Sequence, residues 1–240
     1  MYNLLEKLQE EQPEFITAKI ADCSTVYNSL CRYAREISYK SEAAVNIFEV
    51  NATDSPQFAD KSWLELLTSS NDRTRNAVLE AMNNPDYYFT SVKKDIAYKR
   101  VGQHTIVSDG CHYRTAVAKA VLFRAGKYNF KGIDLTDYLI DFSMAESHRY
   151  LRKLLNTKGL YFPDGKSKIL PRLFLRRTDI KEGVGWRTER YTPVIQINNL
   201  KTGGKMDLAT AKDVLDLISE LHSSPILRRF RSNSYAKFLR

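Results

Sequence analysis

The residues best suited to chemistry stand together in the run from Asp109 to Arg114, which reads Asp-Gly-Cys-His-Tyr-Arg. Asp109 can serve as a metal ligand, a base or a helix cap; His112 can move a proton; and Arg114 can stabilise a developing negative charge. Gly110 and Cys111 stand where a tight turn would direct backbone N–H groups at an anion. We therefore expect Asp109, His112 and Arg114 to be catalytic. We expect Gly110 and Cys111 to bind phosphate.

Two other interpretations of this run stay open. A cysteine at a helix N-terminus beside a histidine has a lowered thiol pKa, which would suit Cys111 as a nucleophile. In a purely structural alternative, Asp109 caps the helix, Cys111 packs inside and His112 is an ordinary surface residue.

The run requires a strand, a turn and a helix to position it. Residues 104–107 read as a short strand, and Gly110 permits the tight turn. Apolar residues at helical spacing then begin at Ala116, and Gly126 is a plausible C-cap. The first turn of such a helix points unpaired N–H groups and a positive partial charge at one spot.

This unit resembles the ParB/sulfiredoxin superfamily over about residues 85–140. The resemblance rests on Asp109-Gly-Cys-His112 and on Ala116, where the family helix usually has alanine. Tyr113 follows the histidine where the family has its arginine, and the arginine here is Arg114. The resemblance implies a ParB/sulfiredoxin-like core in a protein that binds or hydrolyses nucleotides, cuts DNA, or reads DNA during partition.

The metal and cofactor expectations follow from the acidic and thiol residues. Asp134, Asp137 and Asp141 follow the motif helix and, with Asp109, could hold Mg²⁺, which prefers oxygen ligands. The NTPase interpretation implies a nucleoside triphosphate. No HxH or HExxH pattern occurs and the 3 cysteines show no CxxC spacing, so we expect no zinc. His148 is expected at the surface.

Charge is distributed unevenly along the chain. Residues 1–90 carry 8 basic and 14 acidic side chains, a net charge of −6, whereas the other 29 basic and 14 acidic side chains give residues 91–240 a net charge of +15. A basic portion of this size predicts a polyanionic partner, and we expect DNA. The alternative is that the charge only keeps the protein soluble.

Basic residues interleave with aromatic ones in the second half of the chain. Arg172-Leu-Phe-Leu-Arg176 alternates as a strand with one basic face would. Residues 225–240 contain 5 basic and no acidic side chains and read as an electrostatic arm, disordered until it meets DNA. Because this arm has few apolar residues to bury, we expect deletion of residues 226–240 to weaken DNA binding and to leave the fold intact. The expected nucleic-acid-binding residues are Lys166, Lys168, Arg172, Arg176, Arg177, Arg187, Arg190, Arg228, Arg229 and Arg231.

Apolar periodicity and punctuating residues predict the secondary structure. Helices are expected at 1–12, 20–40, from about 60 to 67, from an Asp72 cap to 82, after Gly110, at 145–156, and from an Asp207 cap to Pro225. Strands are expected at 43–50, 87–89, 96–98, 104–107, 130–135, 170–175 and 192–197.

Together these patterns predict an α+β, or α/β, protein in three consecutive parts. A mainly helical, acidic part would cover 1–84, the ParB/sulfiredoxin-like core 85–145, and a basic β-rich part with a last helix and tail 146–240. No apolar run approaches the roughly 20 residues of a membrane span, and no signal peptide is visible, so we expect a cytoplasmic protein without a membrane partner. The expected function is DNA binding with nuclease activity, of a phage or mobile-element type. The alternatives are a non-catalytic, partition-like or regulatory DNA-binding protein and a nucleotide-binding NTPase switch.

Overall fold

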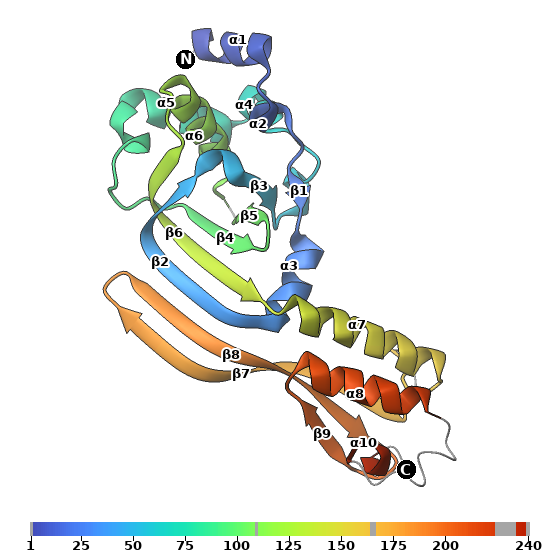
Figure 1. Cartoon of the computed structure of the whole chain (residues 1–240). Helices are drawn as coiled ribbons and strands as arrows, with labels where there is room; N and C mark the ends of the chain where they lie inside the picture. The colour runs from blue at the N-terminus through green and yellow to red at the C-terminus, as the bar shows by residue number, and fades with distance from the viewer. Residues whose placement is uncertain (1, 109, 164–166, 224–233, 239–240) are drawn as a thin grey trace. The chain divides into compact units, whose positions relative to one another are not determined.

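Figure 1 shows the computed structural model of the chain, in which residues 2–108, 110–163, 167–223 and 234–238 are described. Helices and a mixed β-sheet confirm the α+β class. The residues form two compact units that interleave along the sequence. Unit 1 comprises Met1–Ser29, Ile37–Leu139 and Ile180–Thr188, and unit 2 comprises Leu30–Glu36, Ile140–Asp179 and Glu189–Arg240.

The strands are mixed in direction. They are β1 (Ala21–Asp22), β2 (Ala34–Asn46), β3 (Val50–Thr53), β4 (Ala97–Val101), β5 (His104–Val107), β6 (Asn129–Ile140), β7 (Ile169–Gly183), β8 (Trp186–Asn199) and β9 (Lys205–Leu208). Their hydrogen-bonded order is β1-β3-β5-β4-β6-β2-β8-β7, and β9 pairs with β8 off this path. The β1–β3, β3–β5 and β4–β6 pairs are parallel, whereas β4–β5 and β8–β9 are antiparallel.

Helices connect and cover these strands. The α-helices are α1 (Tyr2–Glu11), α2 (Glu14–Thr17), α3 (Ser24–Leu30), α4 (Trp63–Thr68), α5 (Asp72–Asn83), α6 (His112–Arg124), α7 (Phe142–Thr157), α8 (Ala211–His222) and α10 (Ser234–Phe238). Short 3₁₀ helices are η1 (Cys31–Tyr33), η2 (Ile47–Glu49), η3 (Pro56–Phe58) and η4 (Pro85–Tyr88). No helix of the described residues is long and apolar enough to cross a membrane.

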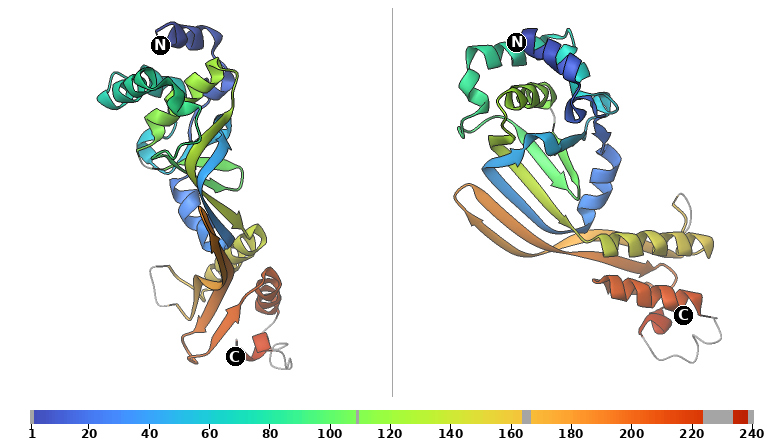
Figure 2. Two further views of the ribbon diagram at one scale, coloured as in Figure 1. Left: turned by 90° about the vertical axis from the view of Figure 1, so that its left-hand side faces the viewer. Right: turned by 45° about the horizontal axis from the view of Figure 1, so that its top comes forward.

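The core of unit 1 is built around α6. Its run from Thr115 to Ala120 is entirely buried, so the helix has no wide polar face. A helix that is apolar nearly all round has to be enclosed. Helices α1, α2, α4 and α5 contact it, and Figure 2 shows the helices of unit 1 gathered beside its strands. The sequence of α6 therefore fixes the turn that precedes it against a packed core.

Unit 2 has a separate core. Helices α7 and α8 lie side by side, as Figures 1 and 2 show. Helix α8 buries Val214, Leu217, Ile218 and Leu221, the i, i+3, i+4, i+7 stripe of a helix with one apolar face. This stripe packs in one cluster with Ile195 and other strand residues of the same unit.

Most of the expected elements are present, with corrections. The helix after Gly110, the one at 145–156, and the strands at 104–107, 130–135, 170–175 and 192–197 are confirmed. The helix expected over 20–40 is wrong: α3 ends at Leu30, and β2 begins at Ala34. Residues 34–46 include Ile37, Tyr39 and Val45, which suit a strand, and the pairing of β2 overrides the helical spacing.

The remaining corrections concern caps and turns. The strand expected at 87–89 is wrong, because Pro85 opens the 3₁₀ helix η4 there. The strand expected at 43–50 is interrupted by η2, where the Asn46 side chain accepts from the Phe48 amide N at 3.1 Å. Helix α5 is capped by Asn71 rather than Asp72, since the Asn71 Oδ1 accepts the Thr74 amide N at 2.9 Å.

Candidate functional site

The turn between β5 and α6 has the expected backbone form. Gly110 has a φ of +82°, a left-handed conformation that side chains rarely adopt, so glycine is required there. Helix α6 follows with Cys111 as its N-cap, and that cap makes no side-chain hydrogen bond to the helix. The Cys111 amide N instead donates to the Ser108 carbonyl O at 3.4 Å. Asp109, expected to bind metal or act as a base, lies outside the described residues.

His112 points into the core of unit 1. Its side chain is fully buried, and its Nε2 lies 2.7 Å from the Thr53 Oγ1. The imidazole stacks on Phe58 with the ring centroids 3.9 Å apart. A general acid or base must reach the proton it transfers, and this imidazole is enclosed by β3 and η3. The catalytic role of His112 stays a prediction to which the geometry lends no support.

Cys111 is also buried. Its Sγ lies 3.9 Å from the carbonyl O of Asp95, and the residue as a whole is 8% exposed. A reactive cysteine needs a partly exposed, electropositive setting. The buried position therefore favours packing, and the amide N of Cys111 already donates to the Ser108 carbonyl O.

Gly110 and Arg114 do come together, in a pocket of about 380 Å³. Gly110, Tyr113 and Arg114 line one wall, and the α5 residues Arg73, Asn76, Ala77 and Glu80 line the other. The Arg114 Nε donates to the Glu80 Oε2 at 3.1 Å, and its NH1 donates to the Asp95 carbonyl O at 3.4 Å. Two arginines and one glutamate give the described lining of the pocket a net positive charge. The pocket can therefore hold a small anion, and the His112 imidazole is directed away from it.

The acidic residues after the motif helix are each engaged elsewhere. Asp134 pairs with Lys93 (Oδ2 to Nζ, 3.6 Å), and Asp137 pairs with Arg100 (Oδ2 to NH1, 3.3 Å). Asp141 caps α7 by accepting the Met144 amide N at 2.9 Å. Among the residues that the structure describes, no group of three or more histidine, cysteine, aspartate or glutamate side chains is placed to hold a metal ion.

The basic strand predicted at Arg172–Arg176 is present. Arg172, Phe174 and Arg176 are exposed on β7, while the intervening Leu173 and Leu175 are half-buried. The Arg176 guanidinium lies 6.0 Å from the Phe174 ring centroid. Alternation along a strand thus places two cations and an aromatic ring on one exposed face of unit 2.

The other expected nucleic-acid-binding residues differ in their surroundings. In unit 2, Arg177 and Arg190 face carboxylates of Glu189 and Glu36, at 3.9 Å and 3.2 Å. Lys168 is exposed. Arg187 belongs to unit 1. Lys166, Arg228, Arg229 and Arg231 lie outside the described residues.

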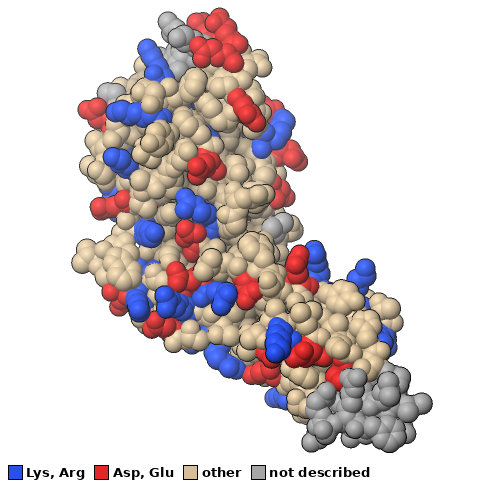
Figure 3. Space-filling view, in the orientation of Figure 1, with Lys and Arg blue, Asp and Glu red and all other residues tan. Residues whose placement is uncertain are grey.

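Figure 3 shows that carboxylates lie among the lysines and arginines over the whole face drawn. Any phosphate-binding surface on this face is therefore local rather than a continuous basic sheet. Opposite charges also meet at Arg176, whose NH2 lies 2.8 Å from the Oδ2 of Asp207.

Two buried lysines are the main features that the sequence interpretation missed. The Lys119 Nζ donates to the Ile47 carbonyl O at 2.8 Å, and burial lowers the pKa of this amine to about 7. The Lys94 Nζ donates to three backbone carbonyls, those of Thr90, Val92 and Lys131. The sequence could have indicated the burial of Lys119, because this residue stands inside the apolar run of α6. Backbone carbonyls of unit 1 thus accept hydrogen bonds from both buried amines.

No family model, curated protein or solved structure matches this chain. The resemblance to ParB and sulfiredoxin proteins therefore depends on the short run around Gly110 and stays a proposal. The site has to be interpreted from its own geometry.

Proposed function

We propose that this chain is a DNA-binding protein, and that unit 2 contacts the DNA backbone through Arg172 and Arg176 of β7. The observation that carries the proposal is the exposed Arg172–Phe174–Arg176 face, with the leucines between them turned inward. Two cations on a strand edge can bind phosphates, and a ring between them can contact sugar or base. The net charge of +15 over residues 91–240 supplies attraction over a longer range.

The spacing of the two arginines suits a polyanion. Four residues of strand span roughly 13 Å at about 3.3 Å per residue. One DNA strand carries a phosphate about every 3.4 Å along the helix axis, so several phosphates fall within that span. These contacts would position the protein on DNA without reading a sequence.

The geometry supports DNA binding better than it supports DNA cleavage. A nuclease mechanism would use His112 as general acid or base, and that imidazole is enclosed between Thr53 and Phe58. The non-catalytic alternative requires only the exposed cations. Incubating supercoiled plasmid with the protein, with and without Mg²⁺, tests cleavage separately, and nicked circles would restore the nuclease hypothesis.

Replacing both arginines tests the binding surface. We expect the Arg172→Gln/Arg176→Gln variant to bind duplex DNA more weakly at every sequence, and to reduce the slope of log affinity against log salt by about one per lost contact. The matched control is Arg149→Gln/Lys153→Gln, which removes the same charge from exposed positions of α7 in the same unit. Equal losses in the two variants, or no duplex binding by the parent at low salt, would overturn the proposal.

A further inference from the structure

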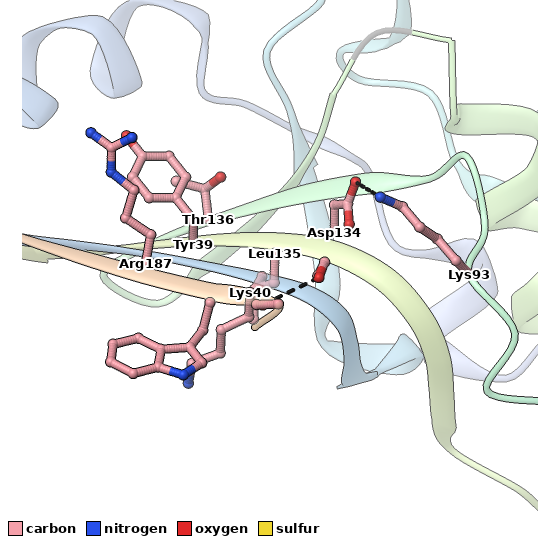
Figure 4. Close-up of a pocket in the computed structure, with 10 residues that line it drawn as sticks. Tyr39, Lys40, Lys93, Asp134, Leu135, Thr136 and Arg187 are labelled. Carbon is pink, nitrogen blue, oxygen red and sulfur yellow. Dashed lines mark hydrogen bonds and ion pairs between the residues drawn. The ribbon is translucent and has the colours of Figure 1, made fainter. Parts of the chain in front are cut away.

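A second surface of unit 1 has the composition of a nucleotide site. A pocket of about 390 Å³ lies where β2, β6 and the start of β8 meet, and Figure 4 shows the residues that line it. Its volume is within the range of small-ligand sites. The walls combine two aromatic rings, Tyr39 and Trp186, with cations that include Lys40 and Arg187. None of these four residues belongs to the β7 face discussed above.

Two contacts fix how β2 and β8 pair at this pocket. The Ser41 amide N donates to the Gly185 carbonyl O at 2.8 Å. The hydroxyl oxygens of Ser38 and Thr188 lie 3.2 Å apart. Between these two contacts the residue number falls from Ser41 to Ser38 in β2 and rises from Gly185 to Thr188 on the other strand. The two strands are therefore antiparallel here, and the residues between the two contacts pair in order.

This register sets each aromatic ring opposite a cation. Tyr39 faces Arg187 across the strands, and Lys40 faces Trp186. Figure 4 shows Tyr39 and Arg187, together with Thr136, on one side of the strands and Lys40 on the other. Since neighbouring strand residues alternate in direction, Trp186 lies on the Lys40 side. Each face of this two-stranded segment thus carries one aromatic–cation pair.

The rings are positioned yet accessible. A Cβ built on Gly183 would lie 2.6 Å from the Trp186 Nε1, so the indole lies directly against the glycine backbone. The φ of Gly183 is not in the left-handed region, and the glycine is needed there to leave room for the ring. Trp186 nevertheless stays 46% exposed and Tyr39 38% exposed. A half-exposed ring held against the backbone, as that of Trp186 is, offers a surface on which a base can stack.

The charge of the pocket is positive. Lys93 is paired with Asp134, with 3.6 Å between Nζ and Oδ2, and Lys40 is a further cation of the lining, beside Trp186. The Lys40 side chain makes no hydrogen bond or ion pair with any residue in the described part of the chain. An ammonium next to an indole presents a phosphate contact beside a stacking surface.

We propose that this pocket binds a nucleotide of single-stranded DNA, with its base stacked on Trp186 and its phosphate on Lys40. The proposal rests on the proposed function in that the ligand is DNA, but it uses different residues. Bases of a duplex are stacked on their neighbours and offer no face to a ring, whereas an unpaired base does. The pocket therefore selects single-stranded over double-stranded DNA.

Trp186 provides a direct reporter of binding. The chain has 2 tryptophans, and Trp63 is only 2% exposed, so a ligand that reaches the surface alters the emission of Trp186. We expect an oligothymidylate to quench the fluorescence of the parent and to leave that of Trp186→Phe unchanged. A deoxynucleoside monophosphate tests the free nucleotide as the source of the same chemistry. If the monophosphate quenches the fluorescence with equal affinity, the ligand of the pocket is a free nucleotide rather than a DNA strand.

Variants then separate stacking from charge. Trp186→Leu should weaken oligothymidylate binding roughly tenfold, the loss expected for one stacked base, and Trp186→Phe should lose less. Lys40→Gln should weaken it and flatten its salt dependence. Tyr128→Leu, which removes another exposed ring of unit 1, is the control and should bind as the parent does. Affinities are measured by anisotropy of a labelled oligonucleotide, after circular dichroism has shown that each variant is folded.

Gly183→Ala tests the position of the ring without removing it. The added methyl group must displace the indole, so we expect weaker single-strand binding with Trp186 still present. All pocket variants should keep the duplex affinity of the parent, since none of them alters Arg172, Phe174 or Arg176. If Trp186→Leu and Gly183→Ala bind the oligonucleotide normally, the pairs only stabilise the hairpin and the inference fails. Loss of duplex binding in the parent would instead mark failure of the proposed function.

Discussion

At the scale of single residues, His148 of α7 is set up to respond to pH. It is 4% exposed, and its Nδ1 lies 2.7 Å from the Tyr33 hydroxyl oxygen. Burial, helped by the nearby charge of Arg152, lowers the pKa of this imidazole from 6.5 to about 4. The sequence interpretation placed His148 at the surface, and the structure corrects this because the core of unit 2 closes over the first half of α7.

The stability of unit 2 should therefore fall in mild acid. Between the ordinary pKa of 6.5 and the lowered value of about 4, the unfolded chain binds a proton on His148 that the folded chain does not. This contribution is complete above the ordinary pKa and is lost as the pH falls toward the lowered one, by about 2 kcal/mol between about pH 7 and pH 5. Urea unfolding at both pH values should show that His148→Gln has lost most of this difference.

The exposed His222 of α8 supplies the comparison. His222→Gln replaces this exposed histidine of the same unit and is measured beside His148→Gln as the control variant. A parent whose unfolding free energy is the same at both pH values would show that His148 is protonated in the folded state.

Local conformation at the candidate site could be predicted, but the directions of its side chains could not. The turn at Gly110 follows from a strand, a glycine and a helical run that are adjacent in sequence. The burial of His112 depends on Thr53 and Phe58, which stand more than fifty positions earlier in the chain. No periodicity near residue 112 indicates that these partners enclose it.

At the scale of elements, the start of α8 distinguishes two assignments of its cap. The sequence interpretation gave the cap to Asp207, but Asp207 lies in β9 and pairs with Arg176. Thr210 is the N-cap: its Oγ1 accepts the Asp213 amide N at 3.1 Å, and the Asp213 Oδ2 accepts the Thr210 amide N at 2.9 Å. This reciprocal pair satisfies two backbone donors that the helix cannot.

Thr210→Ala should lower the free energy of unfolding by about 1 kcal/mol, the usual loss for an N-cap. Asp207→Ala removes a partly exposed ion pair and should cost clearly less. Thermal or urea unfolding of the two variants beside the parent measures the difference. If Asp207→Ala lowers the free energy of unfolding more than Thr210→Ala does, Asp207 rather than Thr210 is the cap.

The strand β7 was predictable for a physical reason that did not apply to β2. Arg172 to Arg176 alternates without interruption, and a period of two can come only from a strand with one covered face. Residues 20–40 place apolar side chains at spacings that fit a helix equally well, and β2 is selected by the neighbours it pairs with. Pairing partners distant in sequence therefore decided the element that local pattern left ambiguous.

At the scale of the whole molecule, consecutive stretches of the chain differ in charge, whereas the packed units combine stretches that are far apart in the sequence. Three consecutive parts with boundaries after residues 84 and 145 describe where the charge changes, and that division stays a prediction. The two compact units are each assembled from three separate segments. Composition averages over neighbours in sequence, so it cannot show that residues 30–36 pack with unit 2 or that residues 180–188 pack with unit 1.

In residues 225–240, both charge and packing matter. Residues 225–240 were expected to be an arm with little to bury, yet Tyr235 and Phe238 pack against the core of unit 2. The Asn199 Nδ2 also donates to the Phe238 carbonyl O at 2.9 Å. The expectation that this segment has little to bury is therefore wrong for α10, and the intact fold expected after its deletion stays a prediction. The arginines at 228, 229 and 231 lie outside the described residues.

Two variants distinguish the contribution of packing in this segment from the contribution of its charge. Truncation before Ser234 removes two half-buried rings and should lower the free energy of unfolding by roughly 2 kcal/mol. Arg228→Gln/Arg229→Gln/Arg231→Gln keeps those rings, so it should unfold as the parent does while binding duplex DNA more weakly and with a shallower salt dependence. Urea unfolding and anisotropy titrations at two salt concentrations measure both effects. If the truncated chain is as stable as the parent, α10 contributes nothing to unit 2; if the triple variant binds as the parent does, these arginines have no part in holding DNA, and the phosphate contacts must come from β7 alone.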